Sequence, residues 1–214
     1  MTYFVTGATG FIGKHLVRKL LEREGTIYVL VRKGSVKKLD ALREYWGTDD
    51  KRVVAVMGDL GKPQLGVAAE DIKKLKGQVD HFYHLAAVYD LSADEESQVQ
   101  VNVEGTRNTV EFAKAVDAGH FHHVSSIAAA GLYEGVFRED MFEEAENLEH
   151  PYFMTKHESE KIVRKESKVP WTVYRPGLVV GDSKTGEMDK IDGPYYFFKP
   201  VSYTHLTLPT ILRV

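Results

Sequence analysis

The chain has no cysteine among its 214 residues. It therefore has neither disulfide bonds nor thiolate metal sites, and it offers no thiol nucleophile for covalent catalysis. It also has no apolar run near the ~18 residues that a membrane span requires, and its N-terminus shows no signal-peptide pattern. We therefore expect a cytoplasmic protein without a membrane span.

A block of basic residues is missing as well. Lys and Arg number 28 against 31 Asp and Glu, which gives a formal net charge of −3. Because proteins that bind nucleic acid carry a basic patch, we expect no nucleic-acid partner. With 43% hydrophobic residues, the chain can bury one core of substantial size but not two.

The most informative stretch is glycine-rich and lies near the N-terminus. Residues 6–13 follow the apolar run 3–5 and open a helical pattern of apolar residues. Gly7 permits a tight turn, Gly10 lets the backbone approach a pyrophosphate, and Gly13 lets the helix pack close to the strand. Glycines also serve turns and caps alone, but this spacing between a strand and a helix favours a dinucleotide. The predicted cofactor contacts in this stretch are Gly7, Thr9, Gly10, Phe11, Ile12 and Gly13.

The strand expected over residues 26–31 ends in two bases, Arg32 and Lys33. In dinucleotide-binding folds an acidic residue about 20 positions after the motif binds the ribose 2′-hydroxyl of NAD, whereas arginine suits the 2′-phosphate of NADP. We therefore predict that Arg32 favours NADP(H). The alternative is that both bases are solvated loop charges.

Strands and helices alternate along the following chain. We expect helices over residues 37–46 and 69–75, and strands over residues 52–57, 79–84 and 121–126. This alternation indicates an α/β fold with a doubly wound parallel sheet of the Rossmann type. Further cofactor contacts are predicted just after strand ends, at Asp59, Leu60, Ala86 and Ala87. Asp59 could instead cap a helix.

The segment 92–116 opens with Ser92 and Glu95 in a capping-box pattern. Gly105 within this segment costs a helix about 1 kcal/mol relative to alanine, so we interpret it as a point of close packing on the sheet. Three nearby histidines, His120, His122 and His123, do not predict a metal site. Adjacent strand residues point to opposite faces, and no third ligand cluster is evident.

A tyrosine and a lysine four residues apart, Tyr152 and Lys156, would share one face of a helix. A nearby cation lowers the pKa of a phenol and makes it a better proton donor. Ser126, at the end of the expected strand, could hold a substrate carbonyl oxygen while a nicotinamide delivers hydride to its carbon. A tyrosine and a lysine at this spacing are common by chance, but their place after a dinucleotide motif favours a catalytic role for all three residues.

Taken together, these motifs resemble the extended short-chain dehydrogenase/reductases. The resemblance rests on residues 6–13, 58–60, 84–87, 102–106, 125–126 and 175–177, and on Tyr152 with Lys156. Residues 58–67 and 181–186 are similar to the branch of fatty acyl-CoA reductases and thioester reductases. Residues 122–131 and 188–198 resemble the N-terminal reductase domain of bacterial two-domain reductases that form fatty alcohols.

The resemblance implies NADPH-dependent reduction of a long-chain fatty aldehyde, or of an acyl-CoA or acyl-carrier thioester, toward the alcohol. It also implies that Ser126 is catalytic, that Tyr152 donates a proton, and that Lys156 binds the nicotinamide ribose and tunes the tyrosine. Because the domain starts at Met1, we expect it not to be the release domain of an assembly-line enzyme.

Residues 200–214 depart from the family pattern and resemble translated sequencing-adapter read-through. We therefore expect an NADP-binding reductase domain over residues 1–199, C-terminally truncated so that its substrate-binding part is incomplete, followed by a non-native tail. The alternative is a genuine short extension. With its substrate region incomplete, the chain is expected to bind NADPH but to turn over poorly.

Two other functions share parts of this pattern. Nucleotide-sugar epimerases and dehydratases have the same cofactor half and the same serine, tyrosine and lysine, but they recycle bound NAD, which Arg32 disfavours. A non-catalytic NADPH-binding module would have no need of Ser126, Tyr152 and Lys156.

Overall fold

The computed structural model describes residues 1–88, 94–188 and 195. The chain divides into two compact units, residues 1–175 and residues 176–214. All the predicted site residues belong to the first unit, whereas Ser92 and the proposed tail at 200–214 lie outside the described residues. No helix in the described ranges has both the length and the apolar character that crossing a membrane demands.

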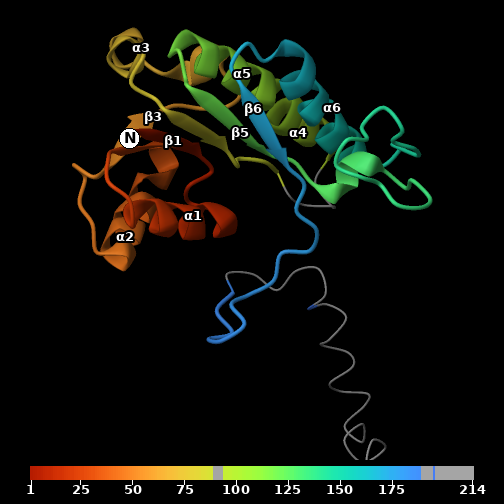
Figure 1. Ribbon diagram of the computed structural model, residues 1–214. Coiled ribbons are helices and arrows are strands. Elements are labelled where there is room, and N and C mark those ends of the chain that lie inside the picture. The colour runs from red at the N-terminus through yellow and green to blue at the C-terminus, as the bar shows by residue number, and fades with distance from the viewer. Residues whose placement is uncertain (89–93, 189–194, 196–214) are drawn as a thin grey trace, which may run out of the picture. The chain divides into compact units, whose positions relative to one another are not determined.

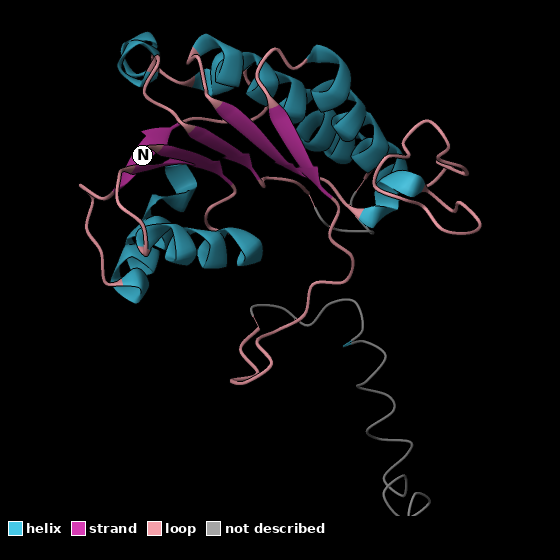
Figure 2. Ribbon diagram, viewed as in Figure 1, coloured by secondary structure: helices cyan, strands magenta, loops and turns pink. Residues whose placement is uncertain are grey.

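In the described residues of the first unit, six parallel strands form one sheet between two layers of helices (Figures 1 and 2). The strand order is β3-β2-β1-β4-β5-β6, so the winding reverses between β1 and β4. Open α/β sheets bind ligands at this switch point, outside the carboxyl ends of the strands. The predicted doubly wound parallel sheet is confirmed.

The elements follow one another in the order strand, then helix, as the right-handed crossovers of a parallel sheet require. They are β1 (Tyr3–Thr6), α1 (Phe11–Leu21), β2 (Ile27–Val31), η1 (Lys33–Ser35), α2 (Val36–Trp46), β3 (Val53–Met57), η2 (Pro63–Gly66), α3 (Ala69–Leu75), β4 (His81–His84), α4 (Glu95–Gln98), η3 (Val99–Glu104), α5 (Gly105–Ala115), β5 (His120–Val124), η4 (Ile127–Ala130), α6 (Pro151–Glu166) and β6 (Trp171–Tyr174).

Successive residues of each strand pack on opposite faces of the sheet. Tyr3 and Val5 join the core beneath α1 and α2. Phe4 joins the core on the other face, where its ring stacks on Phe82 with centroids 4.7 Å apart, and Phe82 stacks in turn on Phe121. The sheet is therefore buried on both faces at its centre, which fixes the positions of the strand ends.

The helical segment after β4 differs from the prediction. The N-cap of α4 is Asp94, whose carboxylate accepts a 2.8 Å hydrogen bond from the Ser97 N–H, whereas Ser92, the predicted cap, lies outside the described residues. The segment η3 is a π-helix between α4 and α5. A Cβ on Gly105 would lie 3.2 Å from the Leu60 Cβ, so this glycine packs against the loop after β3 and not on the sheet.

Candidate functional site

The loop between β1 and α1 forms a narrow backbone cradle. Gly7 has a φ of +73°, and a Cβ there would lie only 2.6 Å from the backbone nitrogen of Ala86. A Cβ on Gly13 would clash with the carbonyl oxygen of Gly7, so Gly13 packs on the turn itself and not on the strand as predicted. A Cβ on Gly10, by contrast, would meet only the Gly7 oxygen, at 3.3 Å. The cradle is thus tight on its inner side and open beyond Gly10.

This open side coincides with the N-terminus of α1. Gly10 is the N-cap and offers no side chain to the first N–H groups of the helix, which also lack intrahelical partners. No acidic residue lies in the first turn. Exposed N–H groups together with the positive end of the helix dipole suit a pyrophosphate. The predicted contacts Thr9, Phe11 and Ile12 lie at this point, and each is partly or largely exposed.

The other predicted cofactor residues lie at the same edge of the sheet, because each follows the carboxyl end of a parallel strand. Arg32 follows β2 and is exposed. Asp59 follows β3, and its Oδ1 accepts a 3.0 Å hydrogen bond from the Gly61 N–H within a turn, whereas the N-cap of the following η2 is Lys62 and not Asp59. Leu60 is held by α5, where the Asn108 amide donates to its carbonyl oxygen at 2.8 Å. Ala86 and Ala87 follow β4 beside Gly7.

The predicted catalytic residues come from η4 and α6, which meet at the end of β5. Ser126 caps η4, with its Oγ accepting from the Ala128 N–H at 3.1 Å. Tyr152 and Lys156 lie on successive turns of α6, as their spacing predicts. The Lys156 ammonium donates a 3.0 Å hydrogen bond to the Val124 carbonyl oxygen, two residues before Ser126. Helix α6 is therefore anchored to the end of the strand from which Ser126 follows.

Burial and hydrogen bonding shift the pKa values of two residues of α6. It lowers the pKa of the Lys156 ammonium to about 8, although the charge of Glu160 opposes this shift. Burial raises the pKa of Glu160, but hydrogen bonds from Arg175, Ser125 and Arg164 outweigh it and hold that pKa below its usual value. Helix α6 thus carries an ionised carboxylate at Glu160 and, one turn earlier, a lysine whose pKa of about 8 lies well below its usual value.

Sequence reasoning gave no role to several buried polar residues around the site. Glu160 accepts a 2.7 Å hydrogen bond from Ser125, the neighbour of Ser126, and it binds Arg175. His84 and Asn102 were noticed only as parts of motifs. The spacing of four residues between Lys156 and Glu160 could have indicated this role, because it places both side chains on the same face of the helix.

The histidines occupy both faces of the sheet. His122 stacks on Tyr83 on one face, while His123 stacks on His84 on the other, as predicted for adjacent strand residues. No group of three or more histidine or acidic side chains in the described ranges is arranged to hold a metal ion. Burial lowers the pKa of His122 to about 4.

The two histidines under α5 and α6 should make the fold sensitive to acid. Burial lowers the pKa of His84 to about 3 and that of His123 well below its usual value. Below pH ~6.5 these histidines take up protons in the unfolded chain but stay neutral in the folded chain. Their contribution to the free energy of unfolding is therefore fully present above that pH and is lost as the pH falls below it. His84 should remove about 2 kcal/mol from the free energy of unfolding between pH 7 and pH 5, and His123 should add to this loss.

Urea unfolding at these two pH values measures the effect, and His123→Phe is the matched variant. Neither ring nitrogen of His123 has a partner among the described residues, so phenylalanine removes no hydrogen bond there. The variant should lose less of its free energy of unfolding than the parent on acidification, because it lacks the His123 imidazole that the folded chain cannot protonate. Equal losses in both proteins would show that His123 is not responsible.

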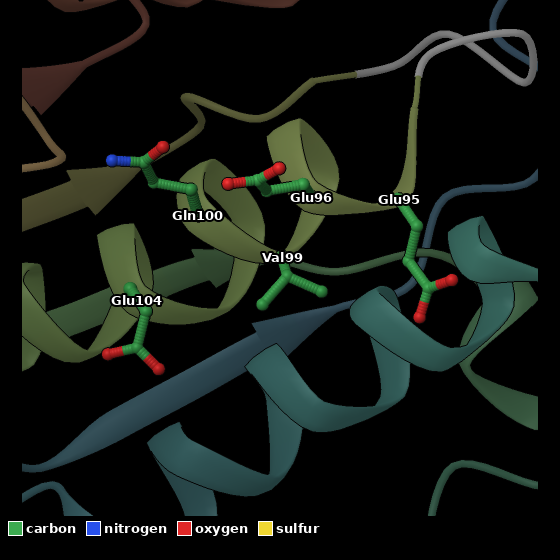
Figure 3. A pocket seen from close by; sticks show the side chains of 5 residues that line it. All are labelled: Glu95, Glu96, Val99, Gln100 and Glu104. Carbon is green, nitrogen blue, oxygen red and sulfur yellow. The ribbon is translucent and has the colours of Figure 1, made fainter.

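A separate depression of about 620 Å³ lies on α4 and η3 (Figure 3). It is lined by Glu95, Glu96, Val99, Gln100 and Glu104. None of the predicted site residues lines it, and its carboxylates would repel a pyrophosphate. The nucleotide site is therefore better placed at the glycine cradle.

A glycine cradle at the switch point of a doubly wound sheet, with a serine, a tyrosine and a lysine near the end of β5, is typical of a Rossmann-type oxidoreductase domain that takes a nicotinamide cofactor. The chain belongs to the male sterility protein family of NAD-binding domains, whose family model matches residues 5–213. The predicted membership of the extended short-chain dehydrogenase/reductases, in the branch of fatty acyl-CoA and thioester reductases, is confirmed.

Its relatives include a subunit of a gramicidin synthase and a fatty acyl-CoA reductase. A linear gramicidin synthase of Brevibacillus parabrevis is 34% identical over 204 residues, which are 88% of this chain and 4% of that protein. The fatty acyl-CoA reductase wat of Drosophila melanogaster is 27% identical over 236 residues, covering 89% of this chain and 46% of that protein. The chain spans about half or less of the length of the curated relatives it matches.

Among solved structures, the terminal R domain from the myxalamid PKS-NRPS biosynthetic pathway has a TM-score of 0.80 and 31% identity. The match covers 92% of this chain and 54% of that domain. The shared part is a reductase-type NAD(P)-binding domain.

Proposed function

We propose that the chain is an NADPH-dependent reductase domain that reduces a long-chain fatty aldehyde, or an acyl-CoA or acyl-carrier thioester, toward the alcohol. The observation that carries the proposal is the anchoring of α6 to the end of β5. Lys156 bonds Val124 and Glu160 bonds Ser125, so the helix that bears Tyr152 is fixed against the residues that precede Ser126.

Three side chains take part in this proposal. NADPH supplies a hydride when bound. Ser126 donates a hydrogen bond to the carbonyl oxygen, and Tyr152 transfers a proton to that oxygen as charge develops on it. Lys156 holds the nicotinamide ribose, and its positive charge favours the phenolate that Tyr152 becomes. An aldehyde thus gains one hydride and one proton, and the tyrosine regains its proton from water.

An apolar substrate is supported by the surface that follows Ser126. Ile127 is 58% exposed and Leu132 is 59% exposed, both on the segment that leads away from the serine. Large exposed apolar side chains beside a reactive group favour an acyl chain over a sugar nucleotide. The fatty acyl-CoA reductase among the relatives supports the same class of substrate.

The test uses the protein in excess over decanal, and separately over a decanoyl thioester, with NADPH deuterated at the transferable position. We expect deuterium in the decanol recovered from the aldehyde, measured by mass spectrometry. If NADPH binds but neither substrate gains deuterium, the non-catalytic NADPH-binding module replaces the reductase.

Replacing Arg32 with alanine tests the cofactor preference. A charge-assisted hydrogen bond from arginine to a phosphate contributes about 1.5–3 kcal/mol, so the Kd for NADPH should rise roughly 10- to 100-fold. The Kd for NADH should not change, because NADH has no 2′-phosphate. Fluorescence titration with both cofactors measures this difference.

Arg18→Ala is the control, since Arg18 is exposed near the other end of α1 and should affect neither cofactor. Equal weakening of NADPH and NADH by Arg32→Ala would contradict the proposed contact. A preference for NAD would favour the epimerase or dehydratase alternative.

A further inference from the structure

His84 ends β4 and lies between two threonines from other elements. It is 1% exposed. Its Nδ1 is 2.7 Å from the Thr6 Oγ1 in β1, and its Nε2 is 3.1 Å from the Thr106 Oγ1 in α5. The imidazole therefore bridges the strand that leads into the glycine cradle and a helix on one face of the sheet.

The neighbouring bonds fix which atom carries each proton. The Thr106 hydroxyl donates its one proton to the Asn102 carbonyl oxygen at 2.6 Å, so it can only accept from His84. The Nε2 of His84 must then carry the ring proton, and the bare Nδ1 accepts from the Thr6 hydroxyl. The Thr6 oxygen in turn accepts from the Ala86 N–H at 3.3 Å. Every donor along this line has one acceptor.

The line continues through Asn102 to the catalytic helix. The Asn102 side chain accepts from the Val88 N–H at 2.8 Å and donates to the Val88 carbonyl oxygen at 3.1 Å. It also donates to the Thr155 hydroxyl at 3.4 Å, and Thr155 donates to the Tyr152 carbonyl oxygen. Residues 86–88, which border the cradle, are thus held at both ends by one hydrogen-bonded network.

We propose that His84, as the neutral tautomer protonated on Nε2, is a positioning residue that sets the backbone of residues 86–88 against the glycine cradle and the helix of Tyr152. This inference rests on the proposed cofactor site. A Cβ on Gly7 would already clash with Ala86, so a small displacement of residues 86–88 closes or opens the cradle. The network also links the cradle to α6, and its loss should weaken cofactor binding.

The histidine can serve as a fixed link because it stays neutral. Burial, with a smaller effect from the charge of Lys156, lowers the pKa of His84 to about 3. Its other close charged or titratable neighbour is His123, which is itself buried and neutral. The hydrogen bonds of His84 to Thr6 and Thr106 should therefore stay the same between pH 5 and pH 9.

Two threonines on α5 provide a matched pair of variants. Thr106 and Thr109 are both buried, and each donates a 2.6 Å hydrogen bond to the carbonyl oxygen four residues earlier. Only Thr106 also accepts from His84. Thr106→Val should cost more stability than Thr109→Val, because it leaves the buried His84 Nε2–H without an acceptor, and only Thr106→Val should raise the Kd for NADPH, by about three- to tenfold. Equal Kd values for the two variants would overturn the proposal.

Variants of the histidine itself supply the second comparison. Glutamine offers an acceptor and a donor at its end, so His84→Gln should bind NADPH more tightly than His84→Phe. If the phenylalanine variant folds and binds as tightly as the parent, His84 has no positioning role. If the phenylalanine variant fails to fold, the Kd values of Thr106→Val and Thr109→Val still test the positioning role of His84.

Nitrogen-15 NMR of the histidine side chains tests the tautomer without any ligand. The His84 signals, assigned with His84→Gln, should report a protonated Nε2 and a bare Nδ1 from pH 8 to pH 5. The opposite tautomer would contradict the proposed network even if NADPH binds. Failure of the parent protein to bind NADPH, with the expected tautomer present, would count against the proposed function alone.

Discussion

Replacing Tyr152 with phenylalanine should lower the rate of carbonyl reduction by about 100-fold or more, while the Kd for NADPH stays close to that of the parent. A positioned general acid typically contributes a factor of about 10² to 10⁴, and phenylalanine cannot donate a proton. The ring of Tyr152 is 6% exposed and lies edge-on to Phe153, with centroids 6.4 Å apart. Phenylalanine keeps that packing, so the variant should fold, and the loss of the proton donor should appear in the rate.

Single-turnover oxidation of NADPH by decanal measures this rate. Tyr133→Phe is the matched control, because Tyr133 lies in the loop after η4 and packs on Phe137 without a proposed chemical role. It should reduce decanal at the parent rate. If Tyr152→Phe does so as well, another group or a water molecule donates the proton, and the assignment of Tyr152 fails.

The fold could be predicted where local patterns agree with tertiary packing. The helix predicted over residues 69–75 is α3. The central strands of the sheet were predicted from nearly continuous apolar runs, and the structure buries these strands on both faces. Strand β6 was not predicted. It has four residues, and what makes it a strand is its pairing with β5, where Thr172 lies opposite His122. A contact between residues so far apart in the chain leaves no periodic signal in so short a segment.

The site residues, too, divide into those that local sequence predicts and those that only long-range contacts determine. The spacing of Tyr152 and Lys156 is a local property of a helix, and a sequence reveals it. The cap of α4 is local too, and in the structure it is Asp94, whose carboxylate accepts from both the N–H and the hydroxyl of Ser97. The hydrogen bond between His84 and Thr6 joins residues 78 positions apart, and no sequence pattern predicts it.

Replacing Glu160 with glutamine should lower the free energy of unfolding by about 3–5 kcal/mol, because it breaks a buried ion pair and leaves a cation uncompensated. The Glu160 side chain is fully buried. Its Oε1 lies 2.6 Å from the Arg175 Nη2 and 2.8 Å from the Arg164 Nε, and the Arg175 side chain is only 13% exposed. Urea unfolding at neutral pH measures the loss.

Glu158 on the same helix provides the control. It pairs with Lys161 at 3.0 Å, but both side chains are more than a third exposed, so Glu158→Gln should cost no more than about 0.5 kcal/mol. Similar losses in the two glutamine variants would mean that the buried pair contributes little to stability.

A double replacement separates stability from positioning in the same network. Glu160→Met combined with Arg175→Met removes the carboxylate and the more buried of its two arginine partners, and Arg164, whose side chain is 23% exposed, can still reach water. The double variant should therefore be more stable than Glu160→Gln alone. It does not restore an acceptor for the Ser125 hydroxyl, which bonds Glu160 at 2.7 Å next to Ser126. The double variant should therefore regain stability but still reduce decanal more slowly than the parent. If the rate recovers together with the stability, Glu160 serves the fold and has no part in placing Ser126.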